Sequence, residues 1–166
     1  MKFMHISDVH LGVKPDAGKA WSEKRAQDIW DSFAEMIEIA AEESPDFLLI
    51  SGDLFHKQPL KRELKEVCGL FARIPQTKVL LMAGNHDYIQ QNSFYRTCEW
   101  PENVCFFPRE EVMCFDFPEL IHFGLYAMPA RHEWVKNYEE IPEDHYDLYF
   151  KHFNPDLYDP KEWASE

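Results

Sequence analysis

Short apolar runs alternate with longer amphipathic segments over the first 87 residues of the chain. Apolar side chains recur at helical spacing between residues 22 and 43 and again between residues 64 and 74, which predicts two helices that each bury one face. The apolar runs before, between and after them predict buried strands at Phe3–Ser7, Phe47–Ile50 and Val79–Met82. The order strand–helix–strand–helix–strand predicts an α/β fold in which helices pack on a parallel sheet.

The pattern changes after residue 87. Three more short strands are predicted, at Val104–Phe107, Val112–Phe115 and Leu120–Tyr126, and the last two are expected to form a hairpin across residues 116–119. Beyond residue 126, prolines and acidic residues interrupt the apolar pattern and favour short helical turns and loops. We therefore expect residues 1–126 to form the folded domain and residues 127–166 to form an acidic, irregular or short-helical segment.

Length and composition fit a single globular domain. The chain has 166 residues, 45% of them hydrophobic, and it contains no apolar run of the roughly 18 residues that a membrane span needs. Its first residues lack the apolar stretch of a signal peptide, so we expect a cytoplasmic protein that does not contact a membrane. The four cysteines, Cys68, Cys98, Cys105 and Cys114, have no metal-site spacing, which favours small buried side chains over a metal or disulfide framework.

The charge of the chain is strongly negative and unevenly distributed. The sequence has 17 basic and 30 acidic side chains, a formal charge of −13, which argues against a tight non-specific binder of duplex nucleic acid. Residues 133–166 hold ten of the acids and three of the bases. Two groups of basic residues interrupt this pattern. Such groups are most often solvated helix faces, but they can also contact phosphates. The first group is Lys14, Lys19, Lys24 and Arg25, and the second is Lys57, Lys61, Arg62 and Lys65.

Polar clusters follow each of the first three predicted strands. They are Asp8-x-His10, then Asp53 with His56, then Asn85-His86-Asp87. A single Asp at a strand end is usually a cap or turn residue, and a single His is more often structural than a ligand. Three clusters at the same edge of a parallel sheet, where ligands bind, favour a metal site instead. Carboxylate, imidazole and amide groups together suit manganese, iron or zinc better than calcium.

These motifs resemble those of a known enzyme family. D-x-H, G-D and G-N-H-D, in this order, resemble the opening motifs of the calcineurin-like metallophosphoesterases. The short segments Ser7–Gly12 and Gly52–His56 are similar in sequence to those of the SbcD-type DNA-repair exonucleases within that superfamily. The resemblance extends from residue 1 to about residue 126. It implies a mixed β-sandwich with flanking helices, of which this chain would carry the N-terminal βαβαβ half and a hairpin.

The resemblance also implies a role for each motif residue. Two divalent cations, most typically manganese but also iron or zinc, would clamp a phosphodiester and activate a water molecule. Asp8 and His10 would bind the first cation, Asp53 would bridge both, and Asn85 would bind the second. His86 would face the scissile phosphate, with Asp87 orienting it and His56 as a second phosphate-side histidine. DNA is the substrate that this resemblance implies.

The later motifs of the family do not match. The family completes its site with a further His and a Gly-His-x-His, but the last glycine here is Gly124. The histidines His122, His132, His145 and His152 have no matching context. We therefore expect an N-terminal fragment or truncated product that binds one cation weakly, hydrolyses phosphodiesters poorly, self-associates and lacks the segments that dock the family's coiled-coil ATPase partner. Two alternatives remain open: a phosphoesterase for nucleotides or phosphoproteins, and a catalytically silent interaction module.

Overall fold

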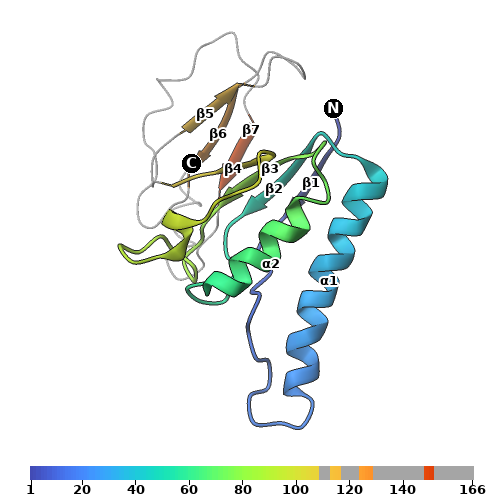
Figure 1. The fold of residues 1–166 in the computed structure, drawn as a ribbon, viewed down its shortest axis with the longest axis vertical. Coiled ribbons are helices and arrows are strands. Elements are labelled where there is room, and N and C mark those ends of the chain that lie inside the picture. The colour runs from blue at the N-terminus through green and yellow to red at the C-terminus, as the bar shows by residue number, and fades with distance from the viewer. Residues whose placement is uncertain (109–112, 117–123, 129–147, 152–166) are drawn as a thin grey trace, which may run out of the picture.

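Two helices cover one face of a four-stranded parallel sheet (Figure 1). The computed structural model describes residues 1–108, 113–116, 124–128 and 148–151. The sheet has the order β1-β2-β3-β4, and all its neighbours are parallel. Its strands and helices are β1 (Phe3–Ile6), α1 (Ser22–Glu43), β2 (Phe47–Ser51), α2 (Lys61–Phe71), β3 (Lys78–Met82) and β4 (Val104–Phe106), and a short 3-10 helix, η1 (Phe94–Thr97), precedes β4.

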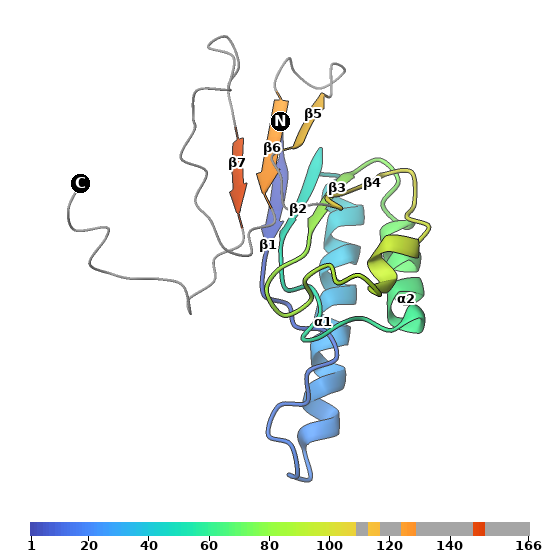
Figure 2. The ribbon, with the colours of Figure 1, turned by 90° about the vertical axis from the view of Figure 1, so that its left-hand side faces the viewer.

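A second sheet lies on the other face of the first one. It contains β5 (Met113–Asp116), β6 (Gly124–Met128) and β7 (Leu148–Lys151), with β5 antiparallel and β7 parallel to β6. Strand β7 contacts β2, and Figure 2 shows this sheet on the side away from α1 and α2. The two facing sheets with outer helices confirm the predicted α/β sandwich. Within the described part of the chain, no helix is both long and apolar enough to cross a membrane.

The core lies between the first sheet and the two helices. Every residue of β2 is buried, and β3 is buried from Val79 onward. Helix α1 contributes Phe33, Ile37 and Ala40 to this core, at the spacing that the sequence predicted. Helix α1 spans the predicted residues, and it ends where Ser44 adopts a left-handed conformation and donates its backbone N–H to the carbonyl of Ala40.

One predicted strand and one predicted helix differ from the structure. Strand β1 was expected to be buried, but its residues alternate between exposed and half-buried because it is the edge strand and pairs with β2 on one side. Helix α2 ends at Phe71 and not near residue 74. The side-chain amide of Asn103 donates hydrogen bonds to the carbonyls of Phe71, Ile74 and Thr77, at 2.9–3.1 Å, and thereby satisfies the end of the helix and the following turn.

The predicted hairpin is confirmed as an antiparallel pair, β5 with β6, although β6 begins at Gly124 and not at Leu120. The expectation of only helical turns and loops after residue 126 is wrong at β7, because the run Leu148-Tyr149-Phe150 favours a strand and pairs with β6. Strand β6 crosses the expected boundary after residue 126, and the division itself stays a prediction. The four later histidines, His122, His132, His145 and His152, lie outside the described residues.

Candidate metal centre

Backbone hydrogen bonds align the segment that follows β1 with the segment that follows β2. The N–H of Asp8 donates to the carbonyl of Gly52 at 3.2 Å, and the N–H of His10 donates to the carbonyl of Asp53 at 3.0 Å. Asp8, His10 and Asp53 all have positive φ angles, of 55°, 55° and 50°. Non-glycine residues rarely adopt this conformation, and such strain concentrates at functional sites. The fold therefore holds the first two polar clusters side by side at some conformational cost.

Asp8, His10 and Asp53 form the first candidate ligand group. The Nε2 atom of His10 lies 3.9 Å from Oδ1 of Asp8 and 4.0 Å from Oδ2 of Asp53, and their ligand atoms all lie within 4.8 Å of one another. Two ligands bound to one cation at roughly 2.0–2.2 Å are separated by at most about 4.4 Å, so both distances fit a shared ion. The carboxylate of Asp53 is 2% exposed, whereas that of Asp8 is 53% exposed and accessible from solvent.

Three histidines form a second group that shares His10 with the first. His10, His56 and His86 have ligand atoms within 4.8 Å of one another. The ring of His10 packs edge-on against both of the other rings, with centroids 5.4 Å from His56 and 4.7 Å from His86, and His56 and His86 stack at 5.1 Å. The Nδ1 atoms of His10 and His56 are buried and have no hydrogen-bond partner among the residues that the structure describes. Such a set of imidazole donors fits a borderline divalent cation.

The predicted ligand Asn85 lies in the loop after β3, between two residues that contact Asp53. The backbone N–H of His86 donates to Oδ1 of Asp53 at 2.8 Å. On the other side, a Cβ atom at Gly84 would lie 2.1 Å from the same Oδ1 atom, so only glycine allows this close approach. The half-buried Asn85 is therefore held beside the carboxylate of Asp53, and its role as a ligand stays a proposal.

His86 and His56 lie at the surface end of the site. The Nδ1 atom of His86 lies 3.1 Å from the backbone carbonyl of His56, which fixes the orientation of the exposed ring. Burial lowers the pKa of His56, and the positive charges of His86, His10 and Lys57 lower this pKa further. His56 is therefore biased toward its neutral form, which can bind a metal ion.

Asp87 was expected to orient His86 from behind, but the structure gives this carboxylate different partners. Asp87 is fully buried and accepts hydrogen bonds from the N–H groups of Gly84 and Phe55, at 2.7 and 3.0 Å, and from the hydroxyl of Tyr95, at 2.7 Å. Its carboxylate thus connects three parts of the chain by hydrogen bonds: the segment after β2, the segment after β3, and η1. Tyr95 was missed in the sequence, because an aromatic residue between Phe94 and Arg96 carries no local signal of a buried polar contact.

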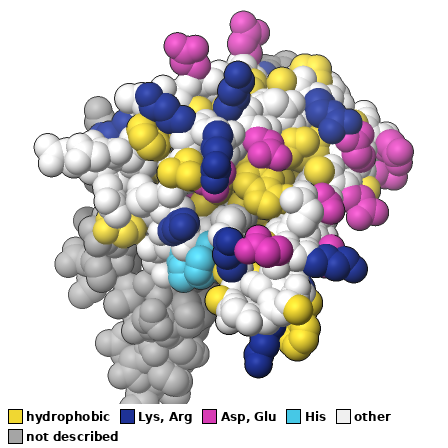
Figure 3. All heavy atoms as spheres, turned by 60° about the horizontal axis from the view of Figure 1, so that its bottom comes forward, with side chains coloured by type: hydrophobic (Ala, Val, Ile, Leu, Met, Phe, Trp, Pro, Cys, Tyr) yellow, Lys and Arg dark blue, Asp and Glu magenta, His cyan; other side chains and the backbone are white. Residues whose placement is uncertain are grey.

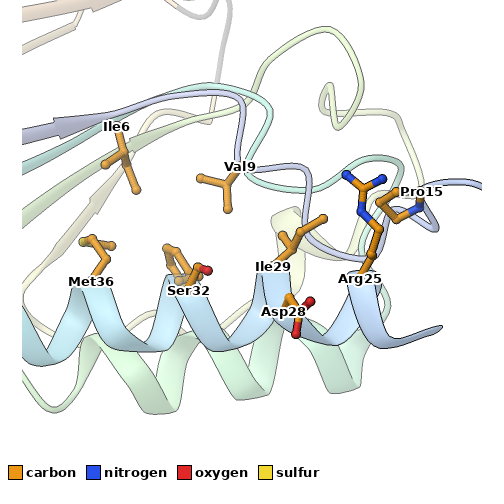
Figure 4. A pocket seen from close by; sticks show the side chains of 9 residues that line it. Ile6, Val9, Pro15, Arg25, Asp28, Ile29, Ser32 and Met36 are labelled. Carbon is orange, nitrogen blue, oxygen red and sulfur yellow. The ribbon is translucent and has the colours of Figure 1, made fainter. Parts of the chain in front are cut away.

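The residue between Asp8 and His10 belongs to the core side of the loop. Figure 4 shows Val9 and Ile6 pointing toward α1, where they face Ile29 and Met36 across a hollow of about 380 Å³. The D-x-H spacing therefore places two polar side chains at the site and one apolar side chain against the helix. This hollow is lined mainly by apolar side chains, and no residue of the two ligand groups lines it.

The surface around the site is more basic than the whole chain. Figure 3 shows histidine side chains at the surface with lysine and arginine side chains on both sides of them. Lys57 directly follows His56 and is exposed, as are Lys61, Arg62 and Lys65 in the next helix. These side chains form a local basic surface that the net charge of the chain conceals.

Comparison with known proteins agrees with the site. The family model described as calcineurin-like phosphoesterase matches residues 1–165. The chain belongs to the calcineurin-like phosphoesterase family. The match includes all three motif clusters, and membership of this family implies divalent metal ions, for which the two candidate ligand groups offer ligand atoms. It also extends past the region, up to about residue 126, over which the motifs alone suggested the resemblance.

Relatives within the calcineurin-like phosphoesterases match the N-terminal half of the chain. The chain is similar to the DNA double-strand break repair protein Mre11 of Archaeoglobus fulgidus, with 40% identity over 90 residues, which is 52% of this chain and 19% of the relative. The same protein of Aeropyrum pernix is 37% identical over 89 residues, 52% of this chain and 21% of the relative. The matched part thus spans about a fifth of the length of these relatives. A crystal structure of Pseudomonas putida nuclease MPE aligns with a TM-score of 0.42 and 20% identity, over 89% of this chain and 59% of that one.

Proposed function

We propose that this chain carries part of a metal-dependent phosphodiester hydrolase that cleaves DNA. The observation that carries the proposal is the group formed by Asp8, His10 and Asp53, whose ligand atoms lie within 4.8 Å at the carboxyl edge of the sheet. The archaeal relatives named above support the choice of DNA, because their names describe repair of DNA double-strand breaks. An intracellular, cytoplasmic location belongs to the same proposal.

Each candidate site residue would have its own role in binding the cations or in transferring a proton. Asp8, His10 and Asp53 would hold one cation, and Asp53 and Asn85 would share a second. Bound cations in such a site neutralise a phosphate and make water a better nucleophile. His86 is exposed, and with Nδ1 fixed on the carbonyl of His56 its imidazolium form can donate a proton from Nε2 to the departing oxygen.

The basic surface supports a polyanionic substrate. Lys57 lies next to His56, and Lys61, Arg62 and Lys65 continue the exposed basic side chains along α2. Lysine and arginine contacts to phosphates position nucleic acid without reading its sequence. The overall charge of −13 favours the second candidate, a phosphoesterase for nucleotides or phosphoproteins, because it repels a long polyanion.

Metal binding is the first quantity to measure. The proposal gives one weak manganese site in the chain alone, at Asp8, His10 and Asp53, because Asp53 and the neutral Asn85 by themselves would hold the second cation too weakly to be detected. Calorimetric titration of the full chain with manganese should show one site per chain, and Asp53→Asn should weaken it by at least tenfold. Two tight sites per chain would contradict this expectation, and iron and zinc titrations would show which ion binds best.

Activity tests the function itself. The full chain with manganese is incubated with a chromogenic phosphodiester, a nucleotide, a phosphopeptide, and single-stranded and duplex DNA. We expect slow, metal-dependent cleavage of the phosphodiester and DNA, a loss of at least tenfold in His86→Ala, and wild-type rates in the control His5→Ala, which alters a histidine of β1 outside both ligand groups. Preferred cleavage of the nucleotide or phosphopeptide supports the second candidate. No cleavage of any substrate by the wild type would support a silent interaction module.

A further inference from the structure

Two cysteines from distant parts of the sequence lie against each other. Cys68 lies in α2, and Cys98 directly follows η1. Their Sγ atoms are 3.5 Å apart, and both side chains are half-buried. A disulfide needs an Sγ–Sγ distance of about 2.05 Å, so the two sulfur atoms have to approach by only about 1.5 Å. A rotation of the two side chains can supply such a movement.

Small molecules can reach this pair of thiols. The two cysteines line an open hollow of about 390 Å³ together with side chains of α2 and η1, among them Leu64, Phe94 and Thr97. Cys105, in contrast, lies in β4 within the first sheet. The hollow gives a reagent direct access to the facing sulfur atoms.

We propose that Cys68 and Cys98 form an intramolecular disulfide when the protein meets a small-molecule disulfide. The thiolate of one cysteine attacks the small disulfide, forms a mixed disulfide and releases one small thiolate. The thiolate of the other cysteine then attacks the protein sulfur of that mixed disulfide, forms the Cys68–Cys98 bond and releases the second small thiolate. The two protein thiols are oxidised, the small disulfide is reduced to two thiols, and the two protons pass to the released thiolates.

The environment of the thiols determines the rate of this exchange. Burial raises the pKa of Cys68 to about 12 and also raises the pKa of Cys98, while the hydrogen bond between the two thiols partly offsets the rise at Cys98. Cys98 is therefore the first nucleophile, and the reaction is slow at neutral pH because little thiolate is present. High-pKa thiolates are poor leaving groups, so the bond also resists reduction once it has formed.

The disulfide would connect α2 to the segment that carries Tyr95. Tyr95 lies in η1, three residues before Cys98, and its hydroxyl donates to the buried Asp87, which directly follows His86. The bond would close a loop that contains β3 and the third motif cluster, which reduces the freedom of the unfolded chain. We expect the oxidised protein to melt at a higher temperature, by roughly 5 °C or more.

The experiment treats the full chain with excess glutathione disulfide at pH 8 and follows the intact mass and the non-reducing peptide map. We expect the loss of two hydrogen atoms per chain and one linked peptide pair that contains Cys68 and Cys98. Cys68→Ser should leave a single glutathione adduct on Cys98, and the matched control Cys105→Ser should form the bond as the wild type does. In urea, where the fold no longer selects partners, the links should be distributed over all four cysteines.

Several results would overturn the proposal. They are separate glutathione adducts on Cys68 and Cys98 in the folded wild type, links that involve Cys105 or Cys114, or no reaction after a day. Circular dichroism of Cys68→Ser and of a second variant, Cys68→Ala, shows whether the substituted chains fold, so that a missing bond is assigned to the missing thiol. Because the readout is mass and melting temperature, the outcome is independent of whether the chain hydrolyses DNA.

Discussion

Gly84 and Asp53 illustrate how single residues shape the metal centre. The backbone of Gly84 packs directly on the buried carboxylate, whose Oδ1 atom accepts the N–H of His86. A carboxylate that is almost completely buried needs such hydrogen bonds, since an unpaired buried charge is costly. The glycine therefore allows the third motif cluster to lie close to the second.

We predict that Gly84→Ala severely destabilises the protein. The added Cβ would lie 2.1 Å from Oδ1 and 2.4 Å from the backbone nitrogen of Asp53, which forces the loop and the carboxylate apart. The free energy of unfolding, measured with urea, should fall by about 3 kcal/mol or more. The matched control is Gly69→Ala in α2, where nothing lies within 4 Å, and which should stabilise the protein by roughly 0.5–1 kcal/mol. Equal effects of the two substitutions would refute this explanation.

The titration of His56 reports the electrostatics of the site. In the protein kept metal-free with a chelator, its NMR titration should have a midpoint below the ordinary value of about 6.5, because burial and nearby positive charges lower the pKa. Lys57→Gln removes one of these charges and should raise the midpoint. Since the folded state lowers this pKa, the stability from neutral His56 is present above pH 6.5 or so and is lost as the pH falls below it. A midpoint at or above the ordinary value would show that burial does not dominate.

At the scale of the elements, Asp87 connects three segments that the sheet alone does not hold together. Its carboxylate accepts hydrogen bonds from the backbone after β2, from the backbone after β3 and from Tyr95 in η1. Burial raises the pKa of Asp87, and its three hydrogen bonds oppose this rise. Removing one hydrogen-bond donor from a buried carboxylate leaves more of its desolvation cost uncompensated.

We predict that Tyr95→Phe lowers the free energy of unfolding by roughly 1–3 kcal/mol, because the buried carboxylate loses a donor while the ring is retained. The loops that carry the metal ligands should also loosen, so calorimetry should show weaker binding of manganese. The control is Thr97→Val in the same short helix, whose exposed hydroxyl donates to the carbonyl of Phe94, and which should change stability by less than about 0.5 kcal/mol. If Tyr95→Phe were as stable as the control, Asp87 would not depend on this hydroxyl.

At the scale of the whole molecule, the first sheet presents β1 at its edge. Among the described strands, β1 pairs with β2 alone, and Phe3 in β1 is 49% exposed. Edge strands with unpaired backbone groups and exposed apolar side chains favour pairing between chains. We therefore expect the chains to associate through strand β1.

We predict that the chain forms dimers or larger species as its concentration increases, which light scattering combined with size-exclusion chromatography measures directly. Phe3→Lys should shift the population toward the monomer, since a charge at an edge strand discourages pairing. Ile39→Lys is the matched control: it replaces another exposed apolar side chain, 46% exposed and in α1, and should leave association unchanged. A wild type that stays monomeric at every concentration would contradict the prediction, as would equal effects of both variants.

The amino-acid sequence by itself determined the parts of this protein that depend on neighbouring residues. The bounds of α1, the positions of β2 and β3, and the three polar clusters at consecutive strand ends follow from local periodicity and from the order of the elements. Parallel pairing of consecutive strands then brings Asp8, His10 and Asp53 to one edge, because the crossover connections require it.

Only the tertiary structure decided the contacts between residues that lie far apart in the chain. The sequence contained no sign that Tyr95 would donate to Asp87, that the His56 carbonyl would hold His86, or that Cys68 and Cys98 would face each other. The exposure of β1 and the strand β7 likewise depended on which neighbours the fold supplies. Local patterns specify which elements form, whereas the hydrogen bonds, burial and close approaches that complete a site arise only when those elements pack together.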